Sequence, residues 1–245
     1  DGLLTAVRTI LVTGGAHRLG AIIVRRLVRD GHRVVIHYNR SGEAARALAD
    51  EIGAVGIVGG DLADSGAIEA LFARARMAAG GAIDALVNSA SLFDYDTPPR
   101  IDPVLLHRLT AIGHAAPVLL ASALARQDDV QDGAVVNILD QKIANLNPDF
   151  FSYTAGKLAL AGATTMLAQA LGPRIRVNAV APGLSLPSGD QTEAEFRAVA
   201  SKNLLERPVD PADIAAAVAF LIDAQGIAGQ TLFVDNGQRY CPRDR

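Results

Sequence analysis

Three side chains in the second half of the chain have the types and spacing of an acid–base site. Tyr153 and Lys157 lie four residues apart, so a helix places the phenol and the ammonium group one turn apart on the same face. A free tyrosine has a pKa of about 10, and a nearby positive charge favours the phenolate. We therefore expect Lys157 to lower the pKa of Tyr153 toward neutral pH, although such pairs also occur on solvated helix surfaces.

Asp140, thirteen residues before the tyrosine, is the third candidate and has two interpretations. In the first, it orients or protonates a substrate together with Tyr153. In the second, it is a loop carboxylate that binds backbone N–H groups. Asp140 follows a predicted central strand and so lies at the same carboxyl edge of the sheet as the other candidate residues, which favours the first interpretation.

A glycine-rich turn near the start of the chain predicts a phosphate site. Residues 13–20 read TGGAHRLG, after an apolar run and before a helical pattern. Glycines let the backbone approach a pyrophosphate, and the free N–H groups and the helix dipole favour the anion. The alternative is a flexible surface loop, which the position of the turn between a predicted strand and a predicted helix makes less favoured. Arg18, where another glycine is common, projects toward the cofactor or a substrate, or it is a surface residue. The predicted cofactor contacts in this turn are Gly14, His17, Arg18, Leu19 and Gly20.

The end of the second predicted strand selects between the two nicotinamide cofactors. An acidic residue here would bind the ribose 2′-hydroxyl of NAD. The chain instead has His37, Tyr38, Asn39, Arg40 and Ser41. An arginine fork and a hydroxyl suit a 2′-phosphate, so we predict NADP(H), against the alternative of an exposed basic loop.

Further candidates follow the other strands. Asp61 and Leu62 would contact the adenine, with an N-cap as the alternative for Asp61. Small residues suited to close cofactor passage, or to a simple turn, follow the fourth strand: Asn88, Ser89 and Ala90. Pro182 and Gly183 end the sixth strand, and the polar stretch after them is a candidate lid. Phe93 is a candidate wall of a flat aromatic slot, or ordinary packing.

Alternating strands and helices must position these residues. The predicted strands are Thr9–Val12, Arg33–His37, Val55–Val58, Ala85–Val87, Ala134–Leu139, Ile175–Val180 and Thr231–Val234. The predicted helices are Leu19–Val28, Glu43–Ile52, Ser65–Ala79, 102–126, Phe151–Leu171 and Pro211–Leu221. Continuous apolar strands between helices predict an α/β fold, a doubly wound, mostly parallel seven-stranded Rossmann-type sheet with helices on both faces. We expect one domain over residues 1–245, with a polar, mobile substrate loop near 184–205.

Composition narrows the class of protein. With 50% hydrophobic residues, 20% charged residues and a net charge of -3, the chain is typical of a globular domain and has no basic run for nucleic acid or anionic lipid. No apolar run approaches the roughly 18 residues that span a bilayer. The five histidines lack metal-ligand spacing, and the single cysteine excludes an internal disulfide. We expect a cytoplasmic protein with no metal, no nucleic-acid partner and no membrane contact.

The motifs resemble those of the short-chain dehydrogenase/reductase family over essentially the whole chain. The motifs in family order are T-G-x-x-x-x-x-G, N-x-A-S, Y-x-x-x-K, R-V-N-A-V-A-P-G and V-D-N-G. The details below resemble its pteridine reductase branch, which includes dihydromonapterin reductases: Arg18, the run His37–Ser41, Ser91 with Phe93, Asp140 where most members carry serine, and Pro182-Gly183-Leu184-Ser185.

The resemblance implies roles for these residues. NADPH would be the hydride donor and a pterin the substrate, with Leu184 and Ser185 added to the cofactor contacts. Arg18, Ser91, Phe93, Asp140 and Tyr153 would contact the substrate, with Phe93 sandwiching it against the nicotinamide. Tyr153 and Asp140 would deliver the proton, while Lys157 holds the nicotinamide ribose and tunes Tyr153. A homotetramer built on the helices near 102–126 and 151–171 would be the assembly.

Two departures from the family pattern bear on activity. Gly113 stands four residues before Pro117, where the family commonly has an asparagine that completes a water relay to the lysine. A water or His114 would have to substitute. The alternatives to an NADPH-dependent pterin C=N reductase are a carbonyl reductase, such as a 3-oxoacyl thioester reductase, and a catalytically impaired nucleotide-binding protein.

Overall fold

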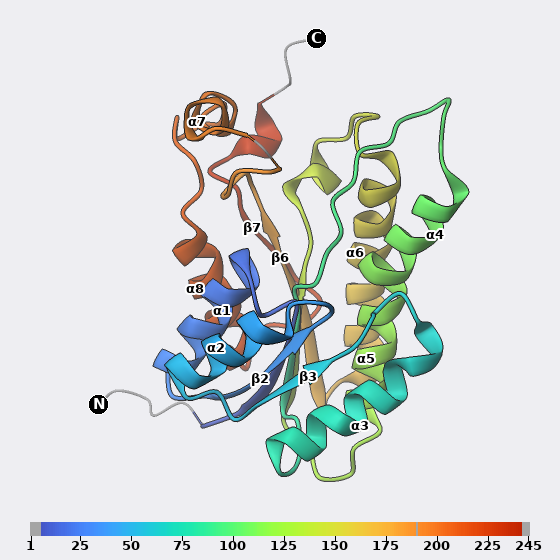
Figure 1. Cartoon of the computed structure of the whole chain (residues 1–245), viewed down its shortest axis with the longest axis vertical. Helices are drawn as coiled ribbons and strands as arrows, with labels where there is room; N and C mark the ends of the chain where they lie inside the picture. The colour runs from blue at the N-terminus through green and yellow to red at the C-terminus, as the bar shows by residue number, and fades with distance from the viewer. Residues whose placement is uncertain (1–5, 190, 242–245) are drawn as a thin grey trace.

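The computed structural model describes residues 6–189 and 191–241 and has a seven-stranded parallel sheet between two layers of helices (Figure 1). The sheet order is β3-β2-β1-β4-β5-β6-β7, and every strand pair is parallel. The predicted sheet is confirmed, and all of it is parallel. Residues 1–5 and 242–245 of the predicted domain, and residue 190 of the predicted loop, lie outside the described residues.

The elements begin and end close to the predicted positions. The strands are β1 (Thr9–Thr13), β2 (Arg33–Tyr38), β3 (Gly56–Gly59), β4 (Ala85–Asn88), β5 (Gly133–Ile138), β6 (Ile175–Pro182) and β7 (Thr231–Val234). The helices are α1 (Arg18–Arg29), α2 (Gly42–Ile52), α3 (Ile68–Ala79), α4 (Pro103–Thr110), α5 (Ala116–Ala125), α6 (Phe151–Leu171), α7 (Glu193–Ala200) and α8 (Pro211–Asp223). Short helical turns are η1 (Ser65–Ala67), η2 (Ala111–Ala115), η3 (Gln141–Ala144) and η4 (Gln238–Tyr240).

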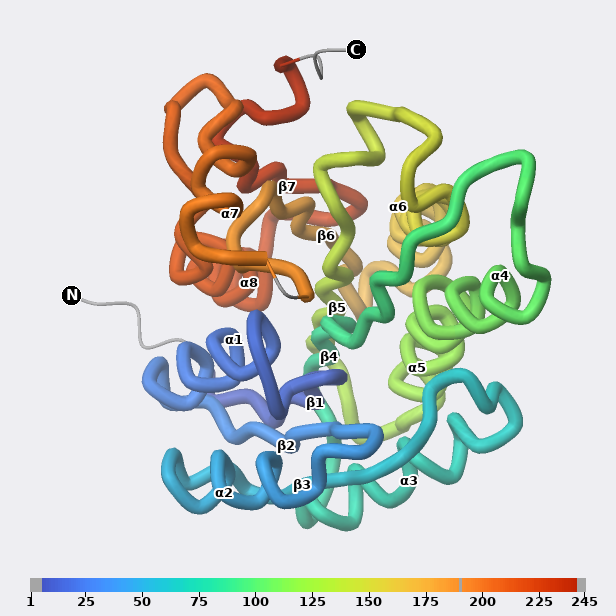
Figure 2. Tube along the Cα trace, turned by 45° about the horizontal axis from the view of Figure 1, so that its top comes forward, coloured from blue at the N-terminus to red at the C-terminus, as the bar shows by residue number. Residues whose placement is uncertain are grey.

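Apolar side chains on both faces of the sheet explain the two helical layers. The central strands β1, β4, β5 and β6 are buried along their whole length, as expected for a parallel sheet that is covered on both sides. One core cluster joins the sheet to α1, α2 and α8. The other joins it to α3, α5 and η2, with residues of α6 packed against it. Figures 1 and 2 show these two groups of helices on opposite sides of the strands.

The strand order creates the place where a ligand binds. The chain winds outward from β1 to β2 and β3, then returns to β4 on the other side of β1. Ligands of open α/β sheets bind at such a reversal, outside the carboxyl ends of the strands. The register aligns Thr13 with Asn88 and Asn88 with Asn137. The loops that follow β1, β4 and β5 therefore leave the sheet at one level.

The predicted helix 102–126 differs in detail from the expectation. It consists of α4 and α5 joined by the π-helical turn η2, which contains Gly113. Counted as one helix, Pro103–Ala125 is long and apolar enough to cross a membrane by length and composition, contrary to the sequence expectation. Here it contributes Leu109, Ile112 and Leu120 to the buried interior instead. About a third of its apolar window is buried within the described chain (33%), and the rest of that window is not.

The predicted loop 184–205 also contains regular structure. Its second half forms α7, which begins with a capping box in which Thr192 and Glu195 bind each other's backbone N–H groups. Phe196 and Ala200 on this helix are buried. The sequence analysis did not predict this helix, because the polar residues of α7 lie on its solvent face.

Candidate functional site

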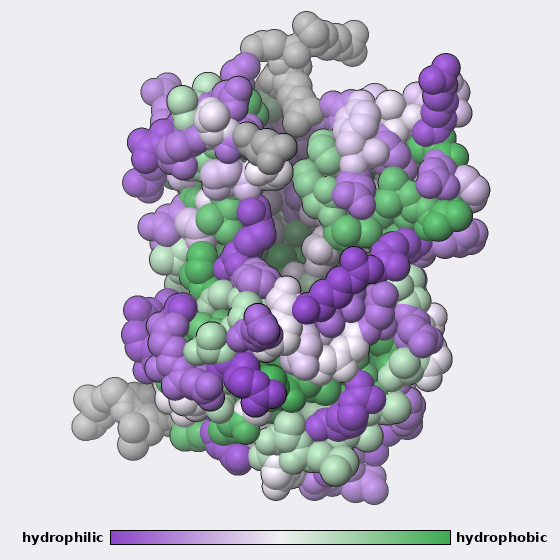
Figure 3. All heavy atoms as spheres, in the orientation of Figure 1, coloured by the Kyte–Doolittle hydropathy of each residue, from purple (hydrophilic) through white to green (hydrophobic). Residues whose placement is uncertain are grey.

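A cavity of about 670 Å³ lies at the carboxyl ends of the strands. In Figure 3 the surface is hollowed between the part formed by α7 and the part formed by α4 and α6. Most of the residues predicted from the sequence border this cavity: Gly14, His17, Arg18, Leu19, Gly20, His37, Asn39, Asp61, Leu62, Ser89, Ala90, Ser91, Phe93, Asp140, Tyr153, Lys157, Pro182, Gly183, Leu184 and Ser185. The fold brings them together from segments far apart in the sequence.

A second cavity adjoins the first beside α2. Tyr38, Arg40 and Ser41 border it, together with His17 and Asn39, which border both cavities. A guanidinium group and a hydroxyl at the end of β2 are the chemistry that a 2′-phosphate requires.

Asn88 differs from its prediction as a cofactor contact. It borders neither of the two cavities and is buried, donating from Nδ2 to Oδ1 of Asn137 at 2.8 Å. Asn137 donates in turn to the hydroxyl of Thr164 on α6 at 3.0 Å. The side chain of Asn88 therefore ties β4 to β5 and, through Asn137, to α6, while its neighbours Ser89 and Ala90 face the cavity.

Two positions of the glycine-rich turn, Gly14 and Gly20, lie too close to neighbouring backbone to carry a side chain. Gly14 has a φ of +63°, and a Cβ there would lie 2.8 Å from Cα of Ala90. A Cβ on Gly20 would lie 2.1 Å from the carbonyl oxygen of Gly14. The hydroxyl of Thr13 accepts from the backbone N–H groups of Ser89 and Ala90 at 3.0 and 3.1 Å, which locks this turn to the loop after β4.

His37 is buried behind this turn and holds it with both ring nitrogens. Nδ1 accepts from the backbone N–H of Gly14 at 3.2 Å, and Nε2 lies 3.0 Å from the carbonyl oxygen of Gly60, to which it donates. This pattern requires the neutral ring. Burial lowers the pKa of His37 from 6.5 to about 4. The predicted cofactor contact thus also fixes the conformation of the turn.

We expect His37 to make the stability of the protein depend on pH. Between pH 6.5 and about 4, His37 is protonated in the unfolded chain but stays neutral in the folded protein. The free energy of unfolding therefore falls as the pH falls through this range. The contribution is about 3 kcal/mol. Urea unfolding at several pH values should show that His37→Gln loses less stability over this range than the wild type. Equal losses in the two proteins would contradict this role, because all other titrating groups are shared.

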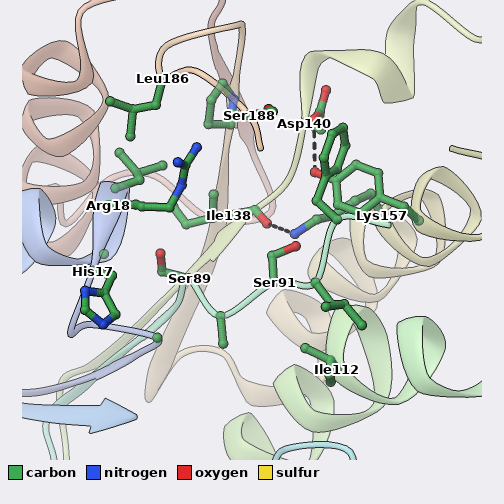
Figure 4. Close-up of a pocket in the computed structure, with 18 of the residues that line it drawn as sticks. His17, Arg18, Ser89, Ser91, Ile112, Ile138, Asp140, Lys157, Leu186 and Ser188 are labelled. Atoms are coloured by element: carbon green, nitrogen blue, oxygen red, sulfur yellow. Dashed lines mark hydrogen bonds between the residues drawn. The ribbon is translucent and has the colours of Figure 1, made fainter. Parts of the chain in front are cut away.

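The acid–base centre joins the three residues with which the sequence analysis began. Tyr153 on α6 donates its phenol proton to Oδ2 of Asp140 at 2.9 Å, while Oδ1 accepts from the backbone N–H of Lys142 at 2.8 Å. The contact with backbone expected in the second interpretation is present at Oδ1, and the contact with Tyr153 at Oδ2 is the geometry that the first interpretation requires. Lys157 donates to the carbonyl oxygen of Ile138 at 2.7 Å, and its Nζ lies 5.6 Å from the Tyr153 ring centroid (Figure 4).

The electrostatics of this centre differ from the sequence expectation. Burial, followed by the charge of Asp140 and the hydrogen bond to it, raises the pKa of Tyr153 well above 10. Burial raises the pKa of Asp140, although this residue keeps some solvent exposure, and it lowers the pKa of Lys157 to about 8. The expected lowering of the Tyr153 pKa by Lys157 is not found in this arrangement, because burial raises the pKa most and a carboxyl group, rather than the ammonium, contacts the phenol. The arrangement is a proton-donating phenol backed by a carboxyl group.

An aromatic wall flanks the acid–base centre. Phe93 stacks on Phe150 with the ring centroids 4.1 Å apart, and it meets Tyr153 edge to face at 4.8 Å. The sequence analysis overlooked Phe150, although an aromatic residue one helical turn before the tyrosine was a usable signal. The stack fixes the plane of Phe93, which is 43% exposed and presents a flat apolar surface to the cavity.

Arg18 connects the glycine-rich turn to the opposite wall. It is an exposed residue with a φ of 50°, and its Nη2 donates to the carbonyl oxygen of Pro187 at 2.7 Å. Figure 4 shows its side chain directed toward the segment that carries Leu186 and Ser188. This contact favours the interpretation that Arg18 belongs to the rim of the cavity over the interpretation that it is an isolated surface residue.

Several residues that the sequence analysis missed also border the first cavity: Leu92, Arg108, Ile112, Ile138, Leu139, Leu186, Ser188 and Gly189. Most are apolar residues in or next to regular elements, which a sequence alone does not separate from core residues. Gly113 and His114, considered for a proton relay, border neither cavity. Among the described residues, and apart from its own helix backbone and chain neighbours, a Cβ on Gly113 would meet no atom within 4 Å, so packing does not force a glycine there.

Comparison with known proteins places the chain in a family. The family model described as enoyl-(acyl carrier protein) reductase matches residues 14–239. The chain belongs to the short-chain dehydrogenase/reductase family. Among curated members, the 3-oxoacyl-[acyl-carrier-protein] reductase FabG of Staphylococcus aureus is 31% identical over 250 residues, covering 94% of this chain and 97% of that protein.

Solved structures of short-chain dehydrogenases/reductases define the cofactor. FolM alternative dihydrofolate reductase 1 from Brucella canis, complexed with NADP, is 40% identical, with a TM-score of 0.90 and 98% coverage of both chains. The Brucella suis structure, also in complex with NADP, is 41% identical, with a TM-score of 0.91 and 95% coverage of both. The cofactor of this chain is NADP(H). The side-chain-free turn at Gly14 and the Arg40–Ser41 pair fit it.

Proposed function

We propose that this protein is an NADPH-dependent reductase of a pterin C=N bond, with a dihydropterin or dihydrofolate-like substrate. The observation that carries the proposal is the 2.9 Å hydrogen bond between Tyr153 and Asp140 inside the cavity. Similarity to structures described as alternative dihydrofolate reductases supports it. The same similarity extends to 3-oxoacyl reductases, so the family alone does not select the substrate.

Reduction of a C=N bond needs a hydride on carbon and a proton on nitrogen. When bound, NADPH supplies the hydride. Tyr153 gives its phenol proton to the nitrogen, and Asp140, whose pKa is raised by burial, returns a proton to the phenolate. The bond becomes a single C–N bond, and one proton is taken up from solvent. Lys157 stabilises the phenolate while it exists and holds the nicotinamide ribose.

The aromatic wall suits a flat heteroaromatic substrate. Phe93, held by Phe150, offers one stacking surface at the mouth of the acid–base centre. We assign Ser91 and Arg18 to hydrogen bonds with the edge of the ring or with the cofactor phosphates. We assign to NADP(H) the remaining cavity residues, which come from the glycine-rich turn, from the ends of β2, β3 and β4, and from Pro182–Ser185. Asn88 does not contact the cofactor in this assignment and instead holds β4 against β5 through Asn137.

The oxidation of NADPH, followed by absorbance, tests the substrate class. We expect higher kcat/KM with 7,8-dihydropterins or dihydrofolate than with acetoacetyl thioesters. Faster turnover of the thioester would instead favour the 3-oxoacyl reductase, the activity of the similar FabG proteins.

Variants at Asp140 test the proton path. Asp140→Asn keeps the size of the side chain but cannot exchange a proton, and Asp140→Ser has the group common in the wider family. Both should lower pterin kcat by about 100-fold, the scale of one general acid. The serine variant should lose little with a ketone. If the asparagine variant retained full pterin turnover, the carboxyl group would not be the proton source.

We also propose a cytoplasmic homotetramer. The exposed face of α6 is apolar, with Phe151, Leu158 and Met166 at 43%, 40% and 63% exposure. Ala155, Ala159 and Gly162 lie exposed between them, so this face can pack closely against a second copy. Light scattering of the purified protein measures the assembly directly.

A further inference from the structure

Arg108 is a charged residue at the cavity that the acid–base chemistry does not use. It lies in the last turn of α4, and it borders both cavities. It therefore stands between the end of β3, where Asp61 and Leu62 line the first cavity, and the end of β2, where Arg40 lines the second.

The guanidinium group of Arg108 is held in place by a carboxylate. Its Nη2 lies 3.2 Å from Oδ2 of Asp61, and the two side chains are 37% and 38% exposed. Oδ1 of Asp61 accepts from the backbone N–H of Ala63 at 3.0 Å. This backbone hydrogen bond, then Arg108 and then Arg40 hold the pKa of Asp61 below its usual value. The carboxylate is therefore ionised and fixed at neutral pH.

We propose that Arg108 binds the adenine ring of NADP(H), covering it from α4 with the plane of its guanidinium group. The hydrogen bond to Asp61 uses the edge of the guanidinium and leaves its faces for stacking on a flat ring. The nearby carboxylate offsets the positive charge, which makes Arg108 a weaker phosphate ligand than Arg40. Arg108 thus recognises the base, and Arg40 recognises the 2′-phosphate.

Cofactor affinity tests the assignment without reference to the substrate. Dissociation constants of NADPH and NADH are measured by fluorescence titration for the wild type, Arg108→Ala, Arg108→Lys and Arg40→Ala. Arg74→Ala is the matched control, because Arg74 on α3 contacts the end of the same strand through the carbonyl oxygen of Gly59 but borders neither cavity. Melting temperatures verify that each variant is folded.

Arg108→Ala should weaken NADPH and NADH equally, by about tenfold, because both carry adenine. Arg108→Lys should recover less than half of that loss, since lysine has charge but no plane. Arg40→Ala should weaken NADPH far more than NADH, and the Arg74 control should change neither. Unchanged affinities, a loss confined to NADPH, or full recovery with lysine would each overturn the assignment. These results do not depend on pterin turnover, so they stand apart from the test of the proposed function.

Discussion

Tyr153→Phe lowers kcat by about 1000-fold while NADPH binds as it does to the wild type, because the variant removes one oxygen and keeps the ring. That oxygen is the only part of Tyr153 that reaches Asp140, at 2.9 Å. The ring keeps its edge-to-face contact with Phe93 at 4.8 Å, so the aromatic wall is unchanged. Stopped-flow and steady-state assays with NADPH and a dihydropterin measure the loss, and a fluorescence titration measures NADPH binding.

Tyr95→Phe is the matched control for this prediction. Tyr95 lies near the same wall, in edge-to-face contact with Phe150, but its hydroxyl points to Asp149 at 3.4 Å. Its loss should change kcat by less than about twofold, the expectation for a group outside the proton path. If Tyr153→Phe kept the wild-type kcat, the phenol would not be the proton donor. NADPH binding without turnover of any substrate by the wild type would instead indicate a catalytically impaired nucleotide-binding protein.

Gly20→Ala is the second substitution with a large expected effect. Its Cβ would lie 2.1 Å from the carbonyl oxygen of Gly14, 2.9 Å from the carbonyl carbon of Gly14 and 3.1 Å from Cα of Gly15. All three neighbours are backbone atoms, so relief requires the turn to separate from α1. We expect a loss of about 100-fold in NADPH affinity, equivalent to about 3 kcal/mol, together with a lower melting temperature.

Gly81→Ala adds the same methyl group where, apart from the two chain neighbours, no described residue lies within 4 Å, and it should leave both affinity and melting temperature unchanged. The comparison separates a steric effect from the general effect of replacing a glycine. Wild-type affinity in Gly20→Ala would show that the first helix does not approach the turn as closely as described.

Local chemistry in the sequence was sufficient for the fold. A continuously apolar strand such as Ala134–Leu139 is buried on both faces only when helices cover both sides of the sheet. The turn at residues 13–20 needs glycine at the positions where its backbone lies against other backbone. The pair Tyr153 and Lys157 shares a helix face by periodicity alone. These features involve residues close in the chain, so the sheet, the glycine-rich turn and the helix that carries Tyr153 could all be predicted.

Contacts across long sequence separations were decided only by the tertiary structure. Asn88 points into the core and Ser89 to the cavity, a choice set by strand register. The polar appearance of 184–205 concealed α7, because half of a surface helix is solvated.

The charge state of the acid–base centre was also set by packing. The pKa of Tyr153 rises because folding buries the phenol against Asp140, whereas spacing along the helix indicated only Lys157. Arg108 of α4 meets Asp61, in the loop after β3, across 47 residues of sequence. The sequence by itself determined which groups reach the carboxyl end of the sheet. Their partners, and therefore their protonation, depended on distances that exist only once the two helical layers have closed on the strands.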